Sequence, residues 1–428
     1  MSSPPRTSAS LIASTSARDR MPARRIAHLV ALVVAGEAVF GLPFHVARFF
    51  RPTVLAGLGL TNSELGQLFA AYGVLAMISY LPGGLLADRC SARRLMAASL
   101  LLTAALGLWL TTTPPLPVLL VIFAGFGVTT ILLFWAALIR ATRAWGGAHM
   151  QGRAFGALDG GRGLFAAGLA SLALLLLHSM LGDPATTSAV DRHAAVRGLF
   201  LVYTAATAVA AAIVWLCVPA DDAPAARVAF DVRQLARTLA SPSLWLQAAV
   251  VFTAYCAFKG VDNYAVYAVQ VHGLDELAGA RISVIAAWLR PCAALAAGLL
   301  ADRIRPTRVA QLCFAGLVLG YLVFLRGEPG DLAALWLAVG VTCAAAFGLR
   351  GVYFAVMEEV RVPVAATGTA VGLISVIGFA PDVILAPLTG WLLDRSPGLA
   401  GHQHVFLLLA ALAATGLLAS LALRRTTR

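Results

Sequence analysis

The hexapeptide GLLADR occurs at residues 84–89 and again at residues 298–303. The two copies lie 214 positions apart, which is half of the 428 residues in the chain. Each copy ends a long apolar segment and leads into arginine-rich sequence, DRCSARR after the first and DRIRPTR after the second. Repetition at a fixed spacing indicates a duplicated architecture. We therefore expect the two halves of the chain to share one fold.

The composition predicts a protein that spans a membrane several times. Hydrophobic residues make up 60% of the chain, charged residues only 12%, and the mean hydropathy is +0.84, whereas soluble domains carry about 25% charged residues. A membrane-spanning helix needs about 20 mostly apolar residues. We predict an all-α membrane protein with 12 transmembrane helices in two pseudo-symmetric six-helix bundles. The predicted spans are 26–50, 63–87, 94–113, 117–140, 154–181, 198–218, 243–269, 280–301, 308–325, 331–357, 364–392 and 404–423.

The polar segments set the expected domain boundaries. We expect a disordered cytoplasmic tail at 1–25, bundles at 26–218 and 243–423, a cytoplasmic linker at 219–242 and a cytoplasmic tail at 424–428. Alternatives for the first segment are a transit peptide or a start at Met21. Loops and tails on the side of the termini hold 21 arginines, and the opposite loops hold about six. Positive loops face the cytoplasm, so this asymmetry explains the net charge of +12 without nucleic acid.

The motif after the second span resembles that of the major facilitator superfamily. The matching residues are Gly84, Leu86, Ala87, Asp88, Arg89, Arg93 and Arg94, with Ser91 where the family has glycine, and a weaker copy at Gly298, Ala301, Asp302 and Arg303. The resemblance implies that Gly84, Asp88, Arg89, Asp302 and Arg303 form a cytoplasmic gate that braces one half against the other. The alternative is that the arginines only mark the cytoplasmic side.

Eight charged residues fall inside the predicted spans at a distance from the span ends. A charge at the centre of a lone helix costs about 2.5–3.5 kcal/mol, so these side chains must pair or face water. The third, sixth, ninth and twelfth spans contain no internal charge, and in the resembled family those four helices pack outside a central cavity. We therefore expect one hydrated cavity lined by charged groups. The eight residues are Glu37, Asp159, Arg162, Lys259, Asp262, Arg290, Arg350 and Asp382.

Two of these acids stand three residues from a base on the same predicted helix. Asp159 with Arg162, and Lys259 with Asp262, can each pair along one helix face. Such pairs could be structural neutralisation alone, and we predict a buried pair for Asp159 and Arg162. Lys259 is the only lysine in the chain, and a buried ammonium changes its protonation more readily than a guanidinium. His45 lies 214 residues before Lys259, in the matching span of the first half.

These observations predict roles for the cavity residues. A guanidinium or ammonium suits an anionic solute, and a desolvated carboxyl group suits proton transfer. We predict substrate binding by Lys259, Arg290, Arg350, Trp135 and Tyr353, and proton coupling by Glu37, Asp382 and Asp262.

The sequence thus predicts a secondary active transporter that works by alternating access. We expect a symporter for a small organic anion coupled to protons, monomeric, in a bacterial inner membrane, with no cofactor or metal. A drug or siderophore exporter is the alternative within the family, although GALDGGRGLFAAG has Gly161 where the family's antiporter motif has proline. A membrane enzyme or receptor is the competing class, but no HExxH, GxSxG, CxxC or phosphate-binding P-loop motif is present.

Overall fold

The computed structural model describes residues 23–147, 150–181, 188–220, 241–353, 355–356, 374 and 376–426. Every regular element among these residues is a helix. Most of the predicted tail (1–25), most of the predicted linker (219–242), the last residues of the predicted C-terminal tail and the first part of the predicted eleventh span (364–392) lie outside the described residues.

The helices follow the predicted spans closely. The first half contains α2 (Ala23–Ala38), η1 (Gly41–His45), α3 (Val46–Phe49), α4 (Arg51–Leu58), α5 (Asn62–Ala87), α6 (Ala92–Leu110), α7 (Leu116–Gly127), η2 (Val128–Trp135), α8 (Ala136–Gly146), α9 (Gln151–Leu181) and α10 (Ala189–Cys217). The second half contains α12 (Pro242–Gly260), η3 (Val261–Asn263), α13 (Tyr264–Gln270), α14 (Glu276–Ile304), α15 (Pro306–Arg326), α16 (Leu332–Val352), α19 (Pro381–Arg395) and α20 (Leu399–Thr426).

Within the described residues, 11 helices are long and apolar enough to cross a membrane, or up to 12 if the bent segment near the start is one span. That segment joins α2 to residues 41–49 with a bend of 41°. The predicted span at 26–50 is therefore present as a bent segment rather than a straight helix. Gly41 and Pro43 lie in the π-helical segment η1, where the proline has no N–H to continue the ladder.

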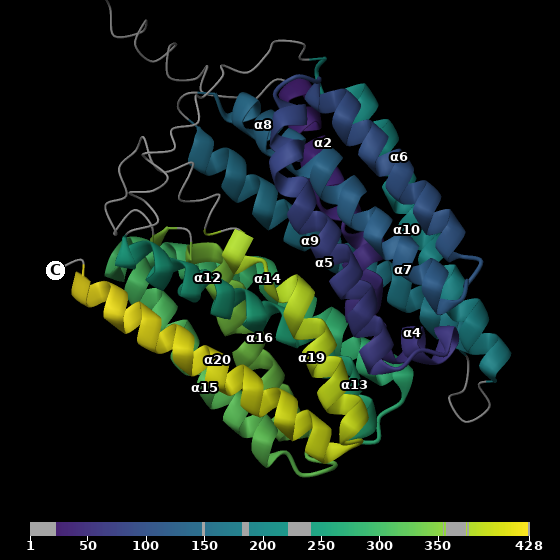
Figure 1. The fold of residues 1–428 in the computed structure, drawn as a ribbon, viewed down its shortest axis with the longest axis vertical. Helices are drawn as coiled ribbons and strands as arrows, with labels where there is room; N and C mark the ends of the chain where they lie inside the picture. The colour runs from purple at the N-terminus through teal and green to yellow at the C-terminus, as the bar shows by residue number, and fades with distance from the viewer. Residues whose placement is uncertain are drawn as a thin grey trace, which may run out of the picture.

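The two halves of the chain form two separate bundles. In Figure 1 the purple-to-teal helices of the first half lie on one side, and the green-to-yellow helices of the second half lie on the other. Helix α5 packs along α19, and α9 packs along α14, so these pairs join the bundles. Because the helices alternate in direction, Ala23, Thr426 and the GLLADR turns share one end, called here the termini side. The opposite end, where α4 meets α13, is the α4 side.

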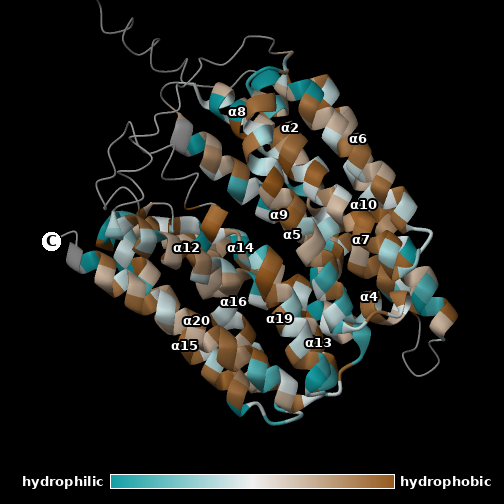
Figure 2. Cartoon of the chain, viewed as in Figure 1, coloured by the Kyte–Doolittle hydropathy of each residue, from teal (hydrophilic) through white to brown (hydrophobic). Residues whose placement is uncertain are grey.

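The outer helices present apolar side chains along their length. Figure 2 shows hydrophobic residues over the whole length of the helices α6, α15 and α20. Large aliphatic side chains that are exposed in the isolated chain suit contact with lipid. This agrees with the expectation that the charge-free third, ninth and twelfth spans lie outside. Exposed leucines on these helices include Leu101, Leu102, Leu108, Leu312, Leu319, Leu322, Leu407, Leu418 and Leu421.

The contact between α5 and α19 depends on glycine. A Cβ atom added to Gly66 would lie 2.6 Å from the carbonyl oxygen of Ala386, and one added to Gly390 would lie 2.3 Å from that of Asn62. Real Cβ atoms essentially never lie this close to another atom. The neighbouring atoms here belong to the backbone, which cannot move aside cheaply, so a larger residue would not fit. The two helices therefore touch backbone to backbone on the α4 side.

The same helix pair shares a helix cap. Thr61 accepts a hydrogen bond from the backbone N–H of Glu64 at 3.1 Å and so caps α5 from within its own half. The carboxylate of Asp394, at the end of α19, accepts the backbone N–H groups of Asn62 at 3.2 Å and Ser63 at 2.6 Å. The first N–H groups of a helix have no partner inside it, so one half of the molecule satisfies a helix end in the other.

Candidate functional site

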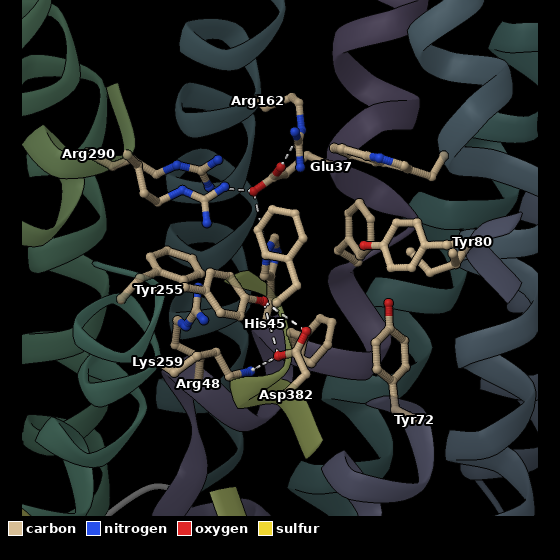
Figure 3. A pocket seen from close by; sticks show the side chains of 17 residues that line it. Glu37, His45, Arg48, Tyr72, Tyr80, Arg162, Tyr255, Lys259, Arg290 and Asp382 are labelled. Atoms are coloured by element: carbon tan, nitrogen blue, oxygen red, sulfur yellow. Dashed lines mark hydrogen bonds and ion pairs between the residues drawn. The ribbon is translucent and has the colours of Figure 1, made fainter. Parts of the chain in front are cut away.

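A cavity of about 670 Å³, open solvent included, lies between the two bundles. Charged and aromatic side chains make up almost all of its wall (Figure 3). It is lined by Glu37, Phe40, Phe44, His45, Arg48, Tyr72, Tyr80, Ile131, Trp135, Arg162, Tyr255, Phe258, Lys259, Arg290, Arg350, Phe379 and Asp382. Eight of these residues are aromatic and six are basic, so the cavity combines flat apolar surfaces with positive charge.

Glu37, on α2, is the centre of one ionic cluster. Only 2% of its side chain is exposed, and it accepts hydrogen bonds from Arg162 at 2.8 Å and from Arg290 at 2.7 Å. His45 lies 3.3 Å away on the same carboxylate. Figure 3 shows both arginines pointing at Glu37 from opposite sides. Because Arg290 belongs to the second half, this cluster joins the two bundles across the cavity.

Asp159 is a weaker member of that cluster. Its carboxylate lies 3.8 Å from Arg162 and 3.7 Å from Arg290, and its side chain is 42% exposed. The prediction of a buried pair is therefore wrong for the acid, although the contact with Arg162 exists. The spacing of three residues places both side chains on one face of α9, but the long arginine side chain reaches on to Glu37 of α2.

Lys259, at the end of α12, is the centre of a second cluster. Its ammonium lies 3.2 Å from Asp382 and 3.5 Å from Asp262. The hydroxyl of Tyr255 donates to Asp382, with 3.0 Å and 2.9 Å to the two carboxylate oxygens. The ammonium also lies 4.2 Å from the ring centre of Phe44, in the other half. The single lysine is thus held by two acids and by an aromatic ring across the interface.

The two halves contribute matching groups to this interface. Arg48 donates to Asp262, and these residues are 214 positions apart, the spacing of the GLLADR repeat. The guanidinium of Arg48 lies 4.2 Å from the ring centre of Phe258, which in turn lies 214 positions after Phe44. Each half therefore places a cation on the equivalent phenylalanine of the other half. Such contacts between charges and rings are attractive.

Arg350, on α16, is the remaining cation of the cavity wall. Its guanidinium lies 4.2 Å from the ring centre of Phe258. Among the described residues, no carboxylate oxygen lies within 4.0 Å of its nitrogens. The hydroxyl of Tyr80 likewise makes no hydrogen bond within the described part of the chain. These two polar groups are free to contact a solute.

Comparison with known proteins identifies the family. The profile of the Major Facilitator Superfamily matches residues 33–381, most of the chain. The chain belongs to this superfamily. Two curated relatives from Escherichia coli (strain K12) match over almost their whole length. Inner membrane protein YqcE is 26% identical over 399 residues, covering 90% of this chain and 91% of the relative. Inner membrane protein YihN is 27% identical over 408 residues, covering 92% and 93%.

Solved structures show the same fold. A bacterial homologue of the human lysosomal transporter Spinster, in an inward-facing and occupied conformation, matches with a TM-score of 0.73 at 14% identity, covering 95% of this chain and 98% of that one. The nucleoside transporter NupG matches with a TM-score of 0.67 at 14% identity, covering 94% and 98%. The facilitator fold, with its two six-helix bundles, is therefore confirmed, and the chain is a multi-pass membrane protein and secondary transporter rather than an enzyme.

Most residues that the sequence predicts for substrate binding and proton coupling lie together around the cavity between the two bundles. All eight predicted intramembrane charges lie at or against the cavity, and Trp135 lines it. Tyr353 is buried and is not among the residues that line it. The sequence reasoning missed Arg48 and Tyr80. Arg48 could have been found, because the repeat spacing of 214 leads from Asp262 directly to it.

Within the described part of the chain, no ion pair or side-chain hydrogen bond of the predicted gate residues joins the two halves. Asp88, Arg89, Asp302 and Arg303 are exposed on the termini side, and no ion pair of theirs occurs within the described part of the chain. Gly84 is partly buried, in the turn of α5 before them. Their predicted role is not tested by this structure.

Polar contacts between the halves are found instead on the α4 side. Besides the cap from Asp394, Arg192 donates to Glu276 at 2.5 Å, and Arg51 donates to Asn263 at 3.0 Å. Arg51 also donates to Asn62 at 3.0 Å. Together with the glycine contacts of α5 and α19, these bonds close the cavity on the α4 side.

Proposed function

We propose that this transporter moves a small organic anion by alternating access, coupled to protons. The observation that carries the proposal is Arg350, a cation in the cavity wall that has no carboxylate partner among the described residues. A guanidinium presents several N–H donors in a plane and suits a carboxylate or phosphate. The aromatic wall, with Trp135 among its members, suits the uncharged body of such a solute.

Proton coupling follows from the way the other cations are held. Arg290 is bound to Glu37, and Lys259 is bound to Asp382 and Asp262. A proton on one of these acids removes its negative charge and releases the cation next to it. We propose that Glu37 or Asp382 carries this proton and that Arg290 or Lys259 then binds the solute. Asp262 would keep Lys259 near the cavity through its bond to Arg48.

The closed end of the cavity supports a proposal about which side of the membrane each end of the molecule faces. The α4 side is closed, and the structural match includes the Spinster homologue in its inward-facing form. We propose that the termini side is cytoplasmic, as the arginine distribution indicates, and that the protein is a monomer in a bacterial inner membrane, in line with the names of its relatives. Asp88, Arg89, Asp302 and Arg303 would then brace the halves in the outward-facing state.

Transport assays on purified protein test this function. Proteoliposomes with an acidic exterior should accumulate labelled small carboxylates, chosen from a panel of acids that raise the melting temperature of the protein. Arg350→Gln should reduce uptake at least about tenfold, the effect of losing roughly 1.4 kcal/mol of binding. Arg308→Gln, on the exposed start of α15, serves as the control. Full uptake by Arg350→Gln, or accumulation of neutral solutes alone, would refute the proposal.

A further inference from the structure

The charges around the cavity do not balance. Four carboxylates belong to the site, and each has a cation within 4.0 Å. Arg350 is the fifth cation and has no such partner in the described part of the chain. With His45 neutral, the nine described residues of this set therefore carry one excess positive charge. Arg51, which also lies near Asp262, is not counted because it belongs to the α4 side and also interacts with Asp394. The cations are Arg48, Arg162, Lys259, Arg290 and Arg350, and the carboxylates are Glu37, Asp159, Asp262 and Asp382.

This excess is tolerable only while water reaches it. Asp159 is 42% exposed and Arg350 is partly exposed, so the cavity is not sealed in this conformation. When the halves close on a solute, the water leaves, and any uncompensated charge inside the membrane becomes costly. A loaded site that is neutral is therefore favoured over one with net charge of either sign.

We infer that the site admits anions by charge balance. A singly charged anion binds at Arg350 without a proton, and each further negative charge on the solute enters together with one proton. This inference rests on the proposed function and gives it a rule: the number of protons bound equals the solute's negative charges minus one. Proton-coupled uptake then implies a solute with at least two negative charges.

Asp382 is the carboxylate best placed to accept the first proton. Glu37 is held by two guanidiniums, whereas Asp382 is held by one ammonium, that of Lys259. After protonation, Asp382 keeps its hydrogen bond with Tyr255, and the ammonium becomes free to meet a second anionic group of the solute. The titratable groups that face Asp382 are Lys259, Tyr255 and Cys256 of α12, and Tyr72 and Tyr80 of α5.

Calorimetry with matched solutes tests the rule. Gluconate and glucarate share one carbon skeleton and carry one and two carboxylates, and glucose is the neutral control; benzoate and phthalate form a second pair. At neutral pH all four acids are fully ionised, because carboxyl groups titrate near pH 4. Titrating the full-length protein in buffers of different ionisation enthalpy gives the protons taken up per bound solute. We expect none for the monoanions and one for the dianions.

Substitutions should shift this count predictably. Arg350→Gln leaves four cations against four carboxylates, so each acid should take up one proton more than with the unchanged protein. Asp382→Asn leaves five cations against three carboxylates, so the dianions should bind without a proton. Glu328→Gln changes an exposed acid outside the cavity that has no part in the proposed mechanism, and it should leave every count unchanged. A purely structural role of these residues would change affinity but not the proton count.

The outcomes separate the inference from the proposed function. Proton uptake that is equal for monoanions and dianions, or unaffected by Asp382→Asn, would overturn the charge-balance rule while leaving anion transport intact. Binding of glucose without binding of any of the four acids would overturn both. Counts of none and one, with the shifts given above, would support the rule.

Discussion

At the scale of single residues, the site is organised by shared partners. Lys259 lies between Asp382 and Asp262 and also faces the ring of Phe44. Its length and its single charged nitrogen allow contact with two acids at once, while three rotatable donors stay flexible. Lys259 is therefore the group that connects the cavity wall to the contact between the halves at Arg48.

Replacing Lys259 should show whether its positive charge is needed for solute uptake. Lys259→Ala removes the one cation that lies within 4.0 Å of Asp382 among the described residues, so uptake of an anion should fall at least about tenfold. Lys259→Arg keeps the charge but not the shape, so uptake should recover only in part. Uptake into proteoliposomes measures the effect of both substitutions, and Arg308→Gln is the control. Undiminished uptake by Lys259→Ala would remove this residue from the site.

Glu37 should be the acid on which stability depends most. Glu37→Gln removes the buried carboxylate of Arg162 and Arg290 and leaves them only the more distant, partly exposed Asp159. Breaking a buried ion pair costs about 3–5 kcal/mol. Asp159→Asn removes an acid from the same cluster, but one that is 42% exposed, where ion pairs contribute at most about 1 kcal/mol. Thermal unfolding should show a much larger loss for Glu37→Gln. Equal losses would contradict the buried cluster described here.

At the scale of elements, the contact of α5 with α19 sets how closely the halves approach. Gly390→Val would place a side chain against the backbone of Asn62, where there is no room. The α4 side should then fail to close. Spin labels at the exposed Thr112 and Glu328, one in each half on that side, should move apart. Gly168→Val, at a position with no atom within 4 Å of the added Cβ, is the control and should leave the distance unchanged.

The sequence predicts the membrane-spanning segments better than the bends and π-helical segments inside them. Apolar length and the repeat at 84–89 and 298–303 were enough for the spans, because both signals are independent of tertiary contacts. The bend after Ala38 has a local signal in Gly41 and Pro43, which the prediction of spans by apolar length does not use. The π-helical segment η2 depends on packing between helices, which no local pattern records. For the same reason, the sequence could not tell that Trp135 lines the cavity whereas Tyr353 is not among the lining residues.

At the scale of the whole molecule, the closed α4 side is held by few polar bonds, so its equilibrium should respond to single changes. Losing a helix cap costs about 0.5–2 kcal/mol, and roughly 1.4 kcal/mol is a tenfold change in population. Asp394→Ala should therefore shift the labelled distance on that side toward the open state. Asp275→Ala removes a cap of α14 within its own half, where Asp275 accepts from Ala278 at 2.6 Å. If both variants shift the distance equally, the cap across the halves has no special role.

The bond between Arg48 and Asp262 has a further consequence for how this protein arose. Equivalent positions of two repeats that touch each other must lie next to the pseudo-twofold axis. In an ancestral homodimer of identical six-helix chains, such a position would face its own copy, so arginine would meet arginine or aspartate would meet aspartate, and like charges repel. An attractive pair at this place therefore requires that the two copies have mutated separately.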